Sequence, residues 1–269
     1  MSIKLIATDM DGTFLDGNHQ YNRSRFREQY QQMQQRGIKF VVASGNQYYQ
    51  LKSFFDDIDV DIAYVAENGA YLVDKQQELY CGEISTGQVQ QVTLCLDQTE
   101  GIETVICGAE SAYLLDSCSE RFFNIMQRYY HRLRKVSDYG QISDRIFKFA
   151  LGYREDDVGP LMAELDGRLT GIVTPVSSGH GSVDLIIPGN HKANGLKKIQ
   201  QIYGIRDDEV LAFGDGGNDL EMLRQAGYGF AMDNASPAAK AAAKYRAPGN
   251  GEQGVLQIID DCLAGRHPF

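Results

Sequence analysis

Cysteine is scarce in this chain of 269 residues, and the pattern of its cysteines excludes two classes of protein. There are five, an odd number, and no two of them form a C-x-x-C pair. Neither a disulfide framework nor a zinc site is therefore expected, and we interpret the cysteines as reduced, mostly structural thiols. They are Cys81, Cys95, Cys107, Cys118 and Cys262.

Long apolar runs are also missing. No run approaches the roughly 18 residues of a membrane span, and the N-terminal stretch MSIKLIATDM lacks the apolar segment of a signal peptide. We therefore expect a cytoplasmic protein. Hydrophobic residues still make up 43% of the chain and charged residues 23%, a balance typical of a globular protein with one large or two modest domains.

Positive charge is in deficit. The chain has 26 lysines and arginines against 36 aspartates and glutamates, a formal net charge of −10, and no basic tail offsets it. Such a field repels nucleic acid and anionic membranes, so neither is expected as a partner. It also repels a small phosphorylated substrate, unless a metal ion or a placed lysine reverses the sign locally. The sequence gives no indication of the oligomeric state.

Four short apolar runs predict the strands of a parallel sheet. Each carries aliphatic residues on both faces, and helical segments separate them, which indicates a sheet covered by helices on both sides. The expected fold is α/β, with a doubly wound, Rossmann-like core. The runs are 4–9, 39–44, 62–67 and 210–215. They end in Asp9, Ser44, Glu67 and Asp215, at the carboxyl ends of the strands, where ligands bind in such sheets.

About 140 residues between the third and fourth runs predict a different fold. Short strand-like runs alternate there with two helical segments, which describes an α+β domain inserted into the sheet domain. The strand-like runs are 104–107, 112–115, 146–151, 172–176 and 183–188, and the helical segments are 119–131 and 155–166. We expect an inserted cap domain at 83–188 and a core domain made of 1–82 and 189–269.

The first motif with chemical content is Asp9-Met10-Asp11-Gly12-Thr13. Side chains two apart on a strand face the same way, so both carboxylates can enter one small volume. Two such carboxylates do not both ionise easily unless a cation lies between them or one stays protonated, which supplies a nucleophile or metal ligand beside a general acid. A solvated Asp-Gly turn is the alternative. An EF-hand is excluded, because its glycine is the sixth residue of the loop and here it is the fourth.

Two further motifs are weaker alone. Ser44-Gly45-Asn46 offers a hydroxyl and backbone amides before a helix, which suits an oxyanion or a phosphate, although an ordinary helix cap is the simpler interpretation. Lys192 opens a helix whose Leu196, Ile199 and Ile202 are expected to face inward. A lysine there opposes the helix dipole, so either an anion contacts both or the lysine faces solvent.

The fourth motif is Gly214-Asp215-Gly216-Gly217-Asn218-Asp219. Asp215 ends a buried strand, the glycines allow close approach of the backbone, and Asn218 or Asp219 can cap the next helix. Hard carboxylate oxygens that leave room for water and phosphate oxygens suit Mg²⁺. A glycine-rich turn with a capped helix is the alternative.

The order of these four motifs is far more specific than any one of them. With it, the chain resembles the haloacid dehalogenase superfamily of aspartate-nucleophile phosphatases. The long insert and the stretch Ala66-Glu67-Asn68-Gly69-Ala70 are similar to the Cof-type branch with its type IIB cap, which includes bacterial sugar-phosphate phosphatases. One departure is Asn46, where many members of the superfamily have arginine.

The resemblance implies a phosphatase acting on phosphate monoesters of small metabolites, with sugar phosphates as the expected class. Asp9 would form an aspartyl-phosphate, Asp11 would act as general acid and then base, and Mg²⁺ would be held by Asp9, the Asp11 carbonyl and Asp215. The implied catalytic set also includes Ser44 and Lys192. Asp219 would orient the residues that contact the metal and the phosphate without contacting either itself. The substrate-binding set implied is Asp9, Met10, Asp11, Ser44, Gly45, Asn46, Lys192 and Asn218.

Other functions stay open at this point. A phosphomutase would share the nucleophile chemistry. A phospho-receiver domain normally takes phosphate on a middle strand and needs only about 120 residues, so the Asp9 motif on the first strand and the long insert argue against it. Dinucleotide binding is disfavoured because no G-x-G-x-x-G follows the first strand. Candidates for contact with the sugar, by placement only, are Tyr48, Tyr49 and the Gly179-His180-Gly181 turn; core packing or a plain turn is the alternative for each.

Overall fold

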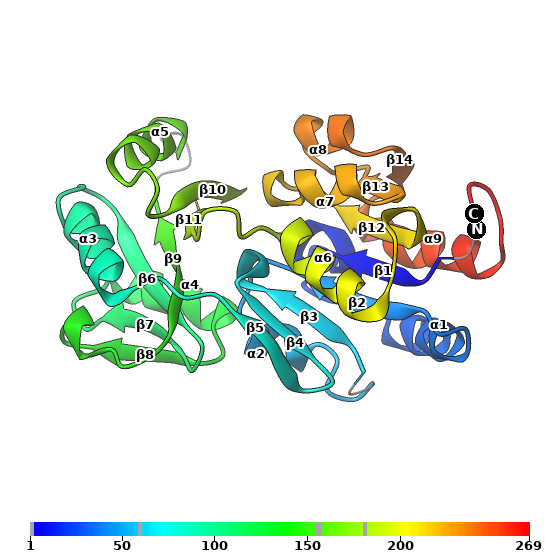
Figure 1. Ribbon diagram of the computed structural model, residues 1–269, viewed down its shortest axis with the longest axis horizontal. Coiled ribbons are helices and arrows are strands. Elements are labelled where there is room, and N and C mark those ends of the chain that lie inside the picture. The colour runs from blue at the N-terminus through cyan, green and yellow to red at the C-terminus, as the bar shows by residue number, and fades with distance from the viewer. Residues whose placement is uncertain (1–2, 59–60, 154–157, 180–181) are drawn as a thin grey trace.

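Two separate β-sheets lie side by side in the protein (Figure 1). The computed structural model describes residues 3–58, 61–153, 158–179 and 182–269. The larger sheet has eight strands in the order β14-β13-β12-β1-β2-β3-β4-β5, and the smaller has six in the order β10-β11-β9-β6-β7-β8. The predicted α/β fold, a Rossmann-like core with an inserted α+β cap, is confirmed.

The larger sheet contains all four strands predicted from the apolar runs. They are β1 (Leu5–Thr8), β2 (Lys39–Ala43), β3 (Ala63–Ala66) and β12 (Val210–Gly214). Parallel pairing joins β12 to β1, β1 to β2 and β2 to β3, so the carboxyl ends of these strands share one edge. Four strands of this sheet were not predicted. Two of them, β13 (Tyr228–Met232) and β14 (Tyr245–Ala247), are parallel to β12. The other two, β4 (Tyr71–Asp74) and β5 (Gln77–Cys81), form an antiparallel hairpin next to β3.

Helices cover both faces of this sheet. Successive residues of a strand face opposite ways, so strands that are apolar throughout give the sheet two apolar faces to bury. Leu5 and Ala7 pack under α6 (Lys192–Tyr203) and α7 (Leu220–Gln225), while Ile6 belongs to the core under α1 (Arg23–Gln35) and α9 (Gly254–Leu263). The shorter α2 (Tyr48–Ser53) follows β2, and α8 (Pro237–Ala242) packs beside α7. This arrangement leaves the strand ends free to carry a site.

One expectation for α6 is wrong. Leu196 and Ile199 are buried as predicted, but Ile202 is 56% exposed. Steps of three residues fall 60° short of a full turn at 100° per residue, so the third position of an i, i+3, i+6 series leaves the buried face. Gln200 is buried instead, and the helix ends at Gly204, whose φ of 64° gives the left-handed cap.

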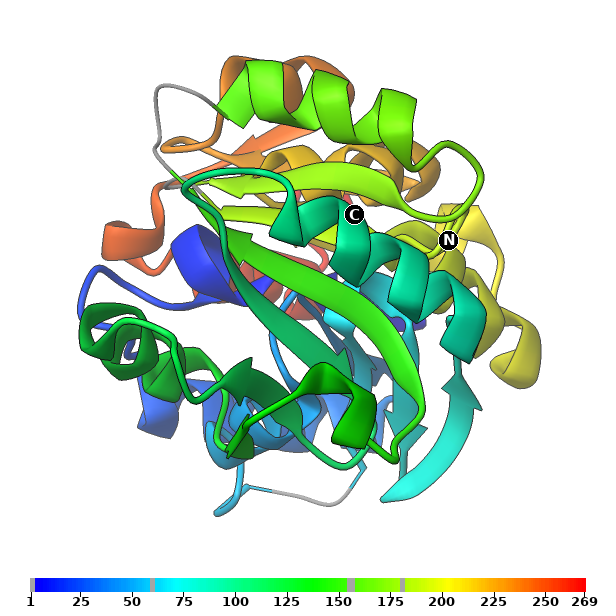
Figure 2. The ribbon, with the colours of Figure 1, turned by 90° about the vertical axis from the view of Figure 1, so that its left-hand side faces the viewer.

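The smaller sheet is mostly antiparallel and has three helices over the described residues. Its strands are β6 (Glu103–Gly108), β7 (Ala112–Leu115), β8 (Leu133–Val136), β9 (Ile146–Gly152), β10 (Thr174–Gly179) and β11 (Ser182–Ile186). α3 (Thr86–Asp97) and α5 (Val158–Arg168) lie over its outer face (Figure 2), and α4 (Glu120–Tyr129) packs on the opposite face. Neither α3 nor β8 was predicted from the sequence.

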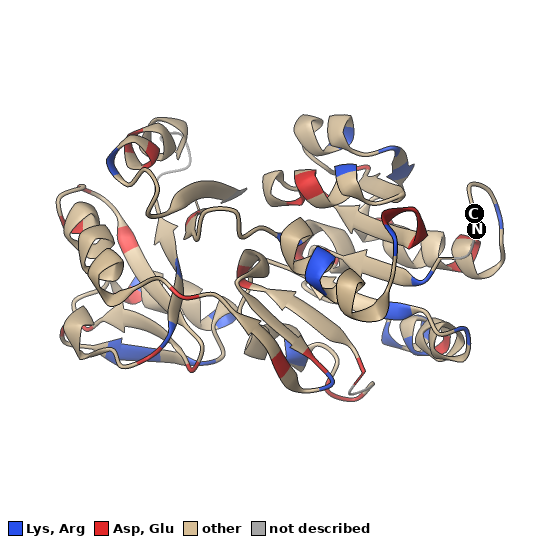
Figure 3. Cartoon of the chain, viewed as in Figure 1, with Lys and Arg blue, Asp and Glu red and all other residues tan. Residues whose placement is uncertain are grey.

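We propose that the cap domain spans 83–188 and the core domain spans 1–82 and 189–269. The sheets support this division, because every strand of the smaller sheet lies between Glu103 and Ile186. Acidic and basic residues are interspersed over both parts (Figure 3). Within the described residues, none of the helices has the length and apolar character needed to cross a membrane.

The two parts touch next to the carboxyl edge of the larger sheet. The Gln47 side chain accepts a hydrogen bond from the Arg132 amide and donates one to its carbonyl, each at 2.9 Å. The Tyr49 hydroxyl donates to the Ala109 carbonyl at 3.1 Å, and the Arg132 guanidinium lies 3.5 Å from the centre of the Tyr49 ring. The cap is therefore seated on the core in this structure.

Candidate active site

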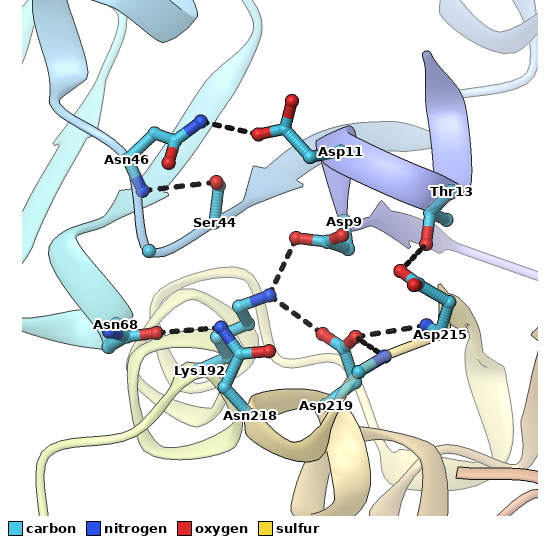
Figure 4. Close-up of polar contacts among 12 residues, drawn as sticks. Asp9, Asp11, Thr13, Ser44, Asn46, Asn68, Lys192, Asp215, Asn218 and Asp219 are labelled. Atoms are coloured by element: carbon cyan, nitrogen blue, oxygen red, sulfur yellow. Dashed lines mark hydrogen bonds and ion pairs between the residues drawn. The ribbon is translucent and has the colours of Figure 1, made fainter. Parts of the chain in front are cut away.

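The motif residues meet where β1, β2 and β12 end and α6 begins (Figure 4). The Lys192 ammonium is at the centre, 2.6 Å from a carboxylate oxygen of Asp9 and 2.7 Å from one of Asp219. Lys192 is only 1% exposed, so the solvent-facing alternative is wrong. The two carboxylates offset the unfavourable position of this cation at the start of a helix.

Asp9 is crowded by other acids. Burial raises the pKa of its carboxyl well above the usual range, and the charges of Asp219 and Asp215 raise it further, while the Lys192 ammonium opposes them. Burial and the Asp219 charge also raise the pKa of Asp215, which accepts a hydrogen bond of 2.8 Å from the Thr13 hydroxyl. Additional positive charge at this place would therefore be stabilised.

Three carboxylates could hold such a charge. Ligand oxygens of Asp9, Asp215 and Asp219 lie within 4.8 Å of one another. Among the described residues, the ammonium that pairs with these carboxylates is that of Lys192, and carboxylate oxygens are the ligands that Mg²⁺ prefers. The donor set therefore fits a hard divalent cation.

Asp219 is already engaged by the protein. One of its carboxylate oxygens accepts the amides of Asp215 and Gly216, at 3.0 and 2.9 Å, and the other accepts from Lys192. It stands at the N-cap position of α7, as predicted, but its side chain makes no hydrogen bond to that helix and accepts the Gly216 amide at the start of the preceding turn. The carboxylate instead fixes the glycine-rich turn that carries Asp215.

Asp11 does not join the cluster of Asp9, Asp215 and Asp219 in the part of the chain that the structure describes. β1 ends at Thr8, so the alternation expected of a strand does not extend to Asp11, which belongs to the following turn. Its carboxylate accepts a hydrogen bond of 2.6 Å from the Asn46 amide and lies 3.1 Å from Nδ1 of His19. The side chain is 36% exposed, so it reaches solvent while Asp9 is buried.

Gly12 shapes the turn between Asp9 and Thr13. Its φ is +74°, and a Cβ built on it would lie 2.6 Å from a carboxylate oxygen of Asp215. We expect Gly12→Ala to displace Asp215 and reduce kcat by roughly 100-fold, since misplacements of about 1 Å have such effects. Steady-state assays beside Gly17→Ala, which meets nothing within 4 Å, would check this. Unchanged kcat in Gly12→Ala would show that the turn tolerates a side chain.

Ser44 is not a helix cap, because the N-cap of α2 is Gln47. Its hydroxyl oxygen accepts the Asn46 amide at 3.1 Å (Figure 4), and a hydroxyl that accepts in this way can still donate its own hydrogen to a ligand. Asn218 comes from the β12 loop, where its side-chain amide donates to Asn68 at 3.0 Å. The Met10 side chain is fully buried in the core, so only its backbone can face a ligand.

The proposed sugar contacts have other partners. Tyr48 packs edge-on against Tyr49, Tyr64 and Tyr71, and Tyr49 contacts the cap as described above. The backbone of Gly179 ends β10, whereas His180 and Gly181 lie outside the described residues.

Sequence reasoning assigned no role to four residues that contact the site: Thr13, Asn68, Lys148 and Asp184. Asn68 belongs to the Ala66–Ala70 stretch that carries the family resemblance. The backbone there has a φ of 52° at Glu67 and 54° at Asn68. Such backbone is uncommon for residues other than glycine, and it turns both side chains toward the cap.

Comparison with known proteins agrees with this geometry. The sequence model of the haloacid dehalogenase-like hydrolases matches residues 6–259, so the chain belongs to that family. It is 49% identical to the Escherichia coli protein named 5-amino-6-(5-phospho-D-ribitylamino)uracil phosphatase YbjI, over 100% of this chain and 99% of that protein.

Solved structures are similar along the whole chain. SMU.1108c from Streptococcus mutans is 36% identical with a TM-score of 0.94, covering 98% of this chain and 100% of that one. The sugar phosphatase BT4131, of subclass IIB, has a TM-score of 0.80 at 22% identity, covering 96% of this chain and 98% of that one, and shows the shared fold.

Proposed function

We propose that the protein is a Mg²⁺-dependent phosphatase of phosphate monoesters of small metabolites, with sugar phosphates as its substrate class. The observation that carries the proposal is the buried Asp9 carboxylate held by Lys192 beside Asp215 and Asp219. The phosphatase names of the E. coli relative and of BT4131 support the activity.

Asp9 is the proposed nucleophile. Lys192 binds one carboxylate oxygen, which leaves the other to attack phosphorus in line. The Asp9 oxygen–phosphorus bond forms while the bond from phosphorus to the leaving oxygen breaks, and Asp11 gives its proton to that oxygen. Water then attacks the aspartyl-phosphate, Asp11 takes the water's proton, and phosphate leaves a regenerated Asp9.

The phosphate oxygens need donors, which the ends of β2, β12 and α6 supply. We propose that the Ser44 hydroxyl, the Gly45 amide, Lys192 and Asn218 hold them. Figure 4 labels Ser44, Lys192 and Asn218 in the same close-up as Asp9. We assign Asn46 to positioning, since its side-chain amide donates to the Asp11 carboxylate at 2.6 Å.

Asp9, Asp215 and the Asp11 carbonyl are the proposed metal ligands. Mg²⁺ bound by these groups would offset the negative charges of the nucleophile and the phosphate. We assign Asp219 to positioning, because its oxygens already accept the Asp215 and Gly216 amides and the Lys192 ammonium.

Metal titrations should separate Asp215 from Asp219. We expect Asp215→Ala, which loses a proposed ligand, to raise the Mg²⁺ concentration needed for half-maximal activity by more than roughly 100-fold, and to remove the increase in Tm that Mg²⁺ gives the wild-type protein. Asp219→Ala should raise that concentration less, by roughly 10- to 100-fold, because it loosens the turn that carries Asp215. It should also lower Tm without Mg²⁺, because two backbone amides and Lys192 lose their partner. Equal shifts in both titrations would contradict the assignment of ligands.

A panel of phosphorylated metabolites tests the function itself. It should contain several sugar phosphates and 5-amino-6-(5-phospho-D-ribitylamino)uracil, the compound in the name of the E. coli relative. Release of inorganic phosphate by the wild-type protein, and none after chelation of divalent ions, is the expected result. Isomerisation of a sugar phosphate without release would indicate a phosphomutase.

A further inference from the structure

Three charged side chains are buried together where the cap meets the core. Lys148 of β9 and Asp184 of β11 come from the cap, and Glu67 comes from the core, directly after β3. The Lys148 ammonium lies 2.7 Å from Glu67 and 3.5 Å from Asp184, and at least 95% of each side chain is buried. Two carboxylates thus share one ammonium away from solvent.

Stability alone is a weak reason for this cluster. Taking charges out of water costs several kcal/mol per ion, and burial raises the pKa of Glu67 despite the opposing Lys148 charge. Burial disfavours the Lys148 cation too, but Asp184 and Glu67 keep its pKa above the usual value. Apolar side chains would pack such a contact at least as well.

Lys148 also contacts the backbone of Ser44-Gly45-Asn46, the segment proposed to bind phosphate, which we call the phosphate loop. Its ammonium donates a hydrogen bond of 2.7 Å to the Gly45 carbonyl. The same peptide unit carries the Asn46 amide hydrogen, which donates to the Ser44 hydroxyl oxygen at 3.1 Å. Since a peptide is planar, holding the carbonyl fixes the direction of that hydrogen. The Asn46 side chain, one bond further along, donates to Asp11.

A second chain of contacts runs through Asp184. Its carboxylate accepts the Asn68 side-chain amide at 2.7 Å, and the Asn68 oxygen accepts from Asn218 at 3.0 Å. A Cβ on Gly45 would lie 3.1 Å from Asn68 and 3.4 Å from Asp184, so the loop fits closely against both. The cap therefore contacts the peptide next to Ser44, through Lys148, and the side chain that accepts from Asn218, through Asp184.

We propose that Lys148 is a positioning residue that holds the Gly45–Asn46 peptide from the cap and so orients the Ser44 hydroxyl and the Asp11 carboxylate. This proposal rests on the proposed function of the same site. The phosphate site is then complete only with the cap seated, so even a substrate too small to touch the cap depends on Lys148.

The experiment compares Lys148→Met with a matched control, Lys39→Met. Lys39 forms a buried ion pair with Asp74 at the opposite end of β2, where Tyr203 remains as a partner of Asp74. Because Lys148→Met leaves two carboxylates buried, a second variant, Lys148→Met/Glu67→Gln/Asp184→Asn, removes all three charges and keeps an oxygen for Asn68. Tm and circular dichroism report folding of each variant.

We expect both Lys148 variants to lose roughly 10- to 100-fold in kcat/KM, by the same factor for p-nitrophenyl phosphate as for a sugar phosphate. The inhibition constant of inorganic phosphate should rise as well. Lys39→Met should leave both quantities within about twofold of the wild type, because it touches none of the groups that hold the phosphate loop.

Three outcomes would overturn the proposal. Unchanged phosphate inhibition in the triple variant would show that Lys148 does not position the phosphate loop. A loss confined to the sugar phosphate would make Lys148 a contact of the leaving group. An equal loss in Lys39→Met would reduce the effect to stability. If the wild-type protein hydrolyses no ester, the proposed function fails, and calorimetric titration of inorganic phosphate into the same variants with Mg²⁺ present still tests positioning.

Discussion

Asp9→Asn should lower kcat by roughly four orders of magnitude or more, which is the size of loss typical when a catalytic nucleophile is removed. The amide cannot form the aspartyl-phosphate, whereas its oxygen can still accept the Lys192 ammonium that Asp9 accepts at 2.6 Å. The fold should persist, because the substitution removes one of three crowded carboxylates and relieves the repulsion from Asp219 and Asp215, which adds to the effect of burial in raising the pKa of Asp9. Affinity for inorganic phosphate should rise with the loss of that negative charge.

The measurements are phosphate release at enzyme concentrations high enough to detect slow turnover, thermal unfolding, and calorimetric titration of inorganic phosphate. Asp208→Asn is the control, since Asp208 is exposed and pairs only with Arg206 among the contacts described for its side chain. Substantial turnover by a folded Asp9→Asn protein would exclude the covalent mechanism.

The gathering of Asp9, Ser44, Lys192 and Asp215 could be predicted from the sequence because parallel sheets impose it. β12, β1 and β2 are neighbours, so polar residues at their ends share one edge although Asp9 and Asp215 are 206 positions apart. The apolar character of these strands is readable locally, since both of their faces are covered. The direction of each side chain after the strand ends could not be predicted in this way.

The remaining parts depend on tertiary contacts. Asp11 leaves the strand pattern because the chain turns at Gly12, and its partner Asn46 is on another loop. Lys148 lies in an apolar strand, where a lone lysine gives no sign of burial against Glu67. α3 contains glycine, threonine and valine, which have low helix propensity and weaken the helical pattern. The spacing of Ser85 and Gln88, which form a capping box, does indicate the start of a helix.

Asp11→Asn gives the sharper test of proton transfer, because its effect should depend on the leaving group. A sugar alkoxide needs protonation to leave, so we expect kcat on a sugar phosphate to fall by about 10²–10⁴-fold. Nitrophenolate leaves without a proton, so p-nitrophenyl phosphate should still phosphorylate Asp9. The next step lacks its base, and the aspartyl-phosphate should accumulate.

Rapid mixing with excess p-nitrophenyl phosphate should therefore show a burst of about one nitrophenolate per active site, followed by slow turnover. The sugar phosphate should show no burst. The side-chain oxygen that Asp11→Asn retains can still accept from Asn46, so the loop keeps its hydrogen bond. Asp16→Asn is the matched control. Asp16 lies in the same loop, and the contacts described for its side chain are those with the Asn18 and Gln20 amides, so its substitution should leave both substrates unaffected. If Asp11→Asn slows both substrates equally and without a burst, Asp11 transfers no proton in either step, and its contacts with Asn46 and His19 serve only to shape the entrance to Asp9.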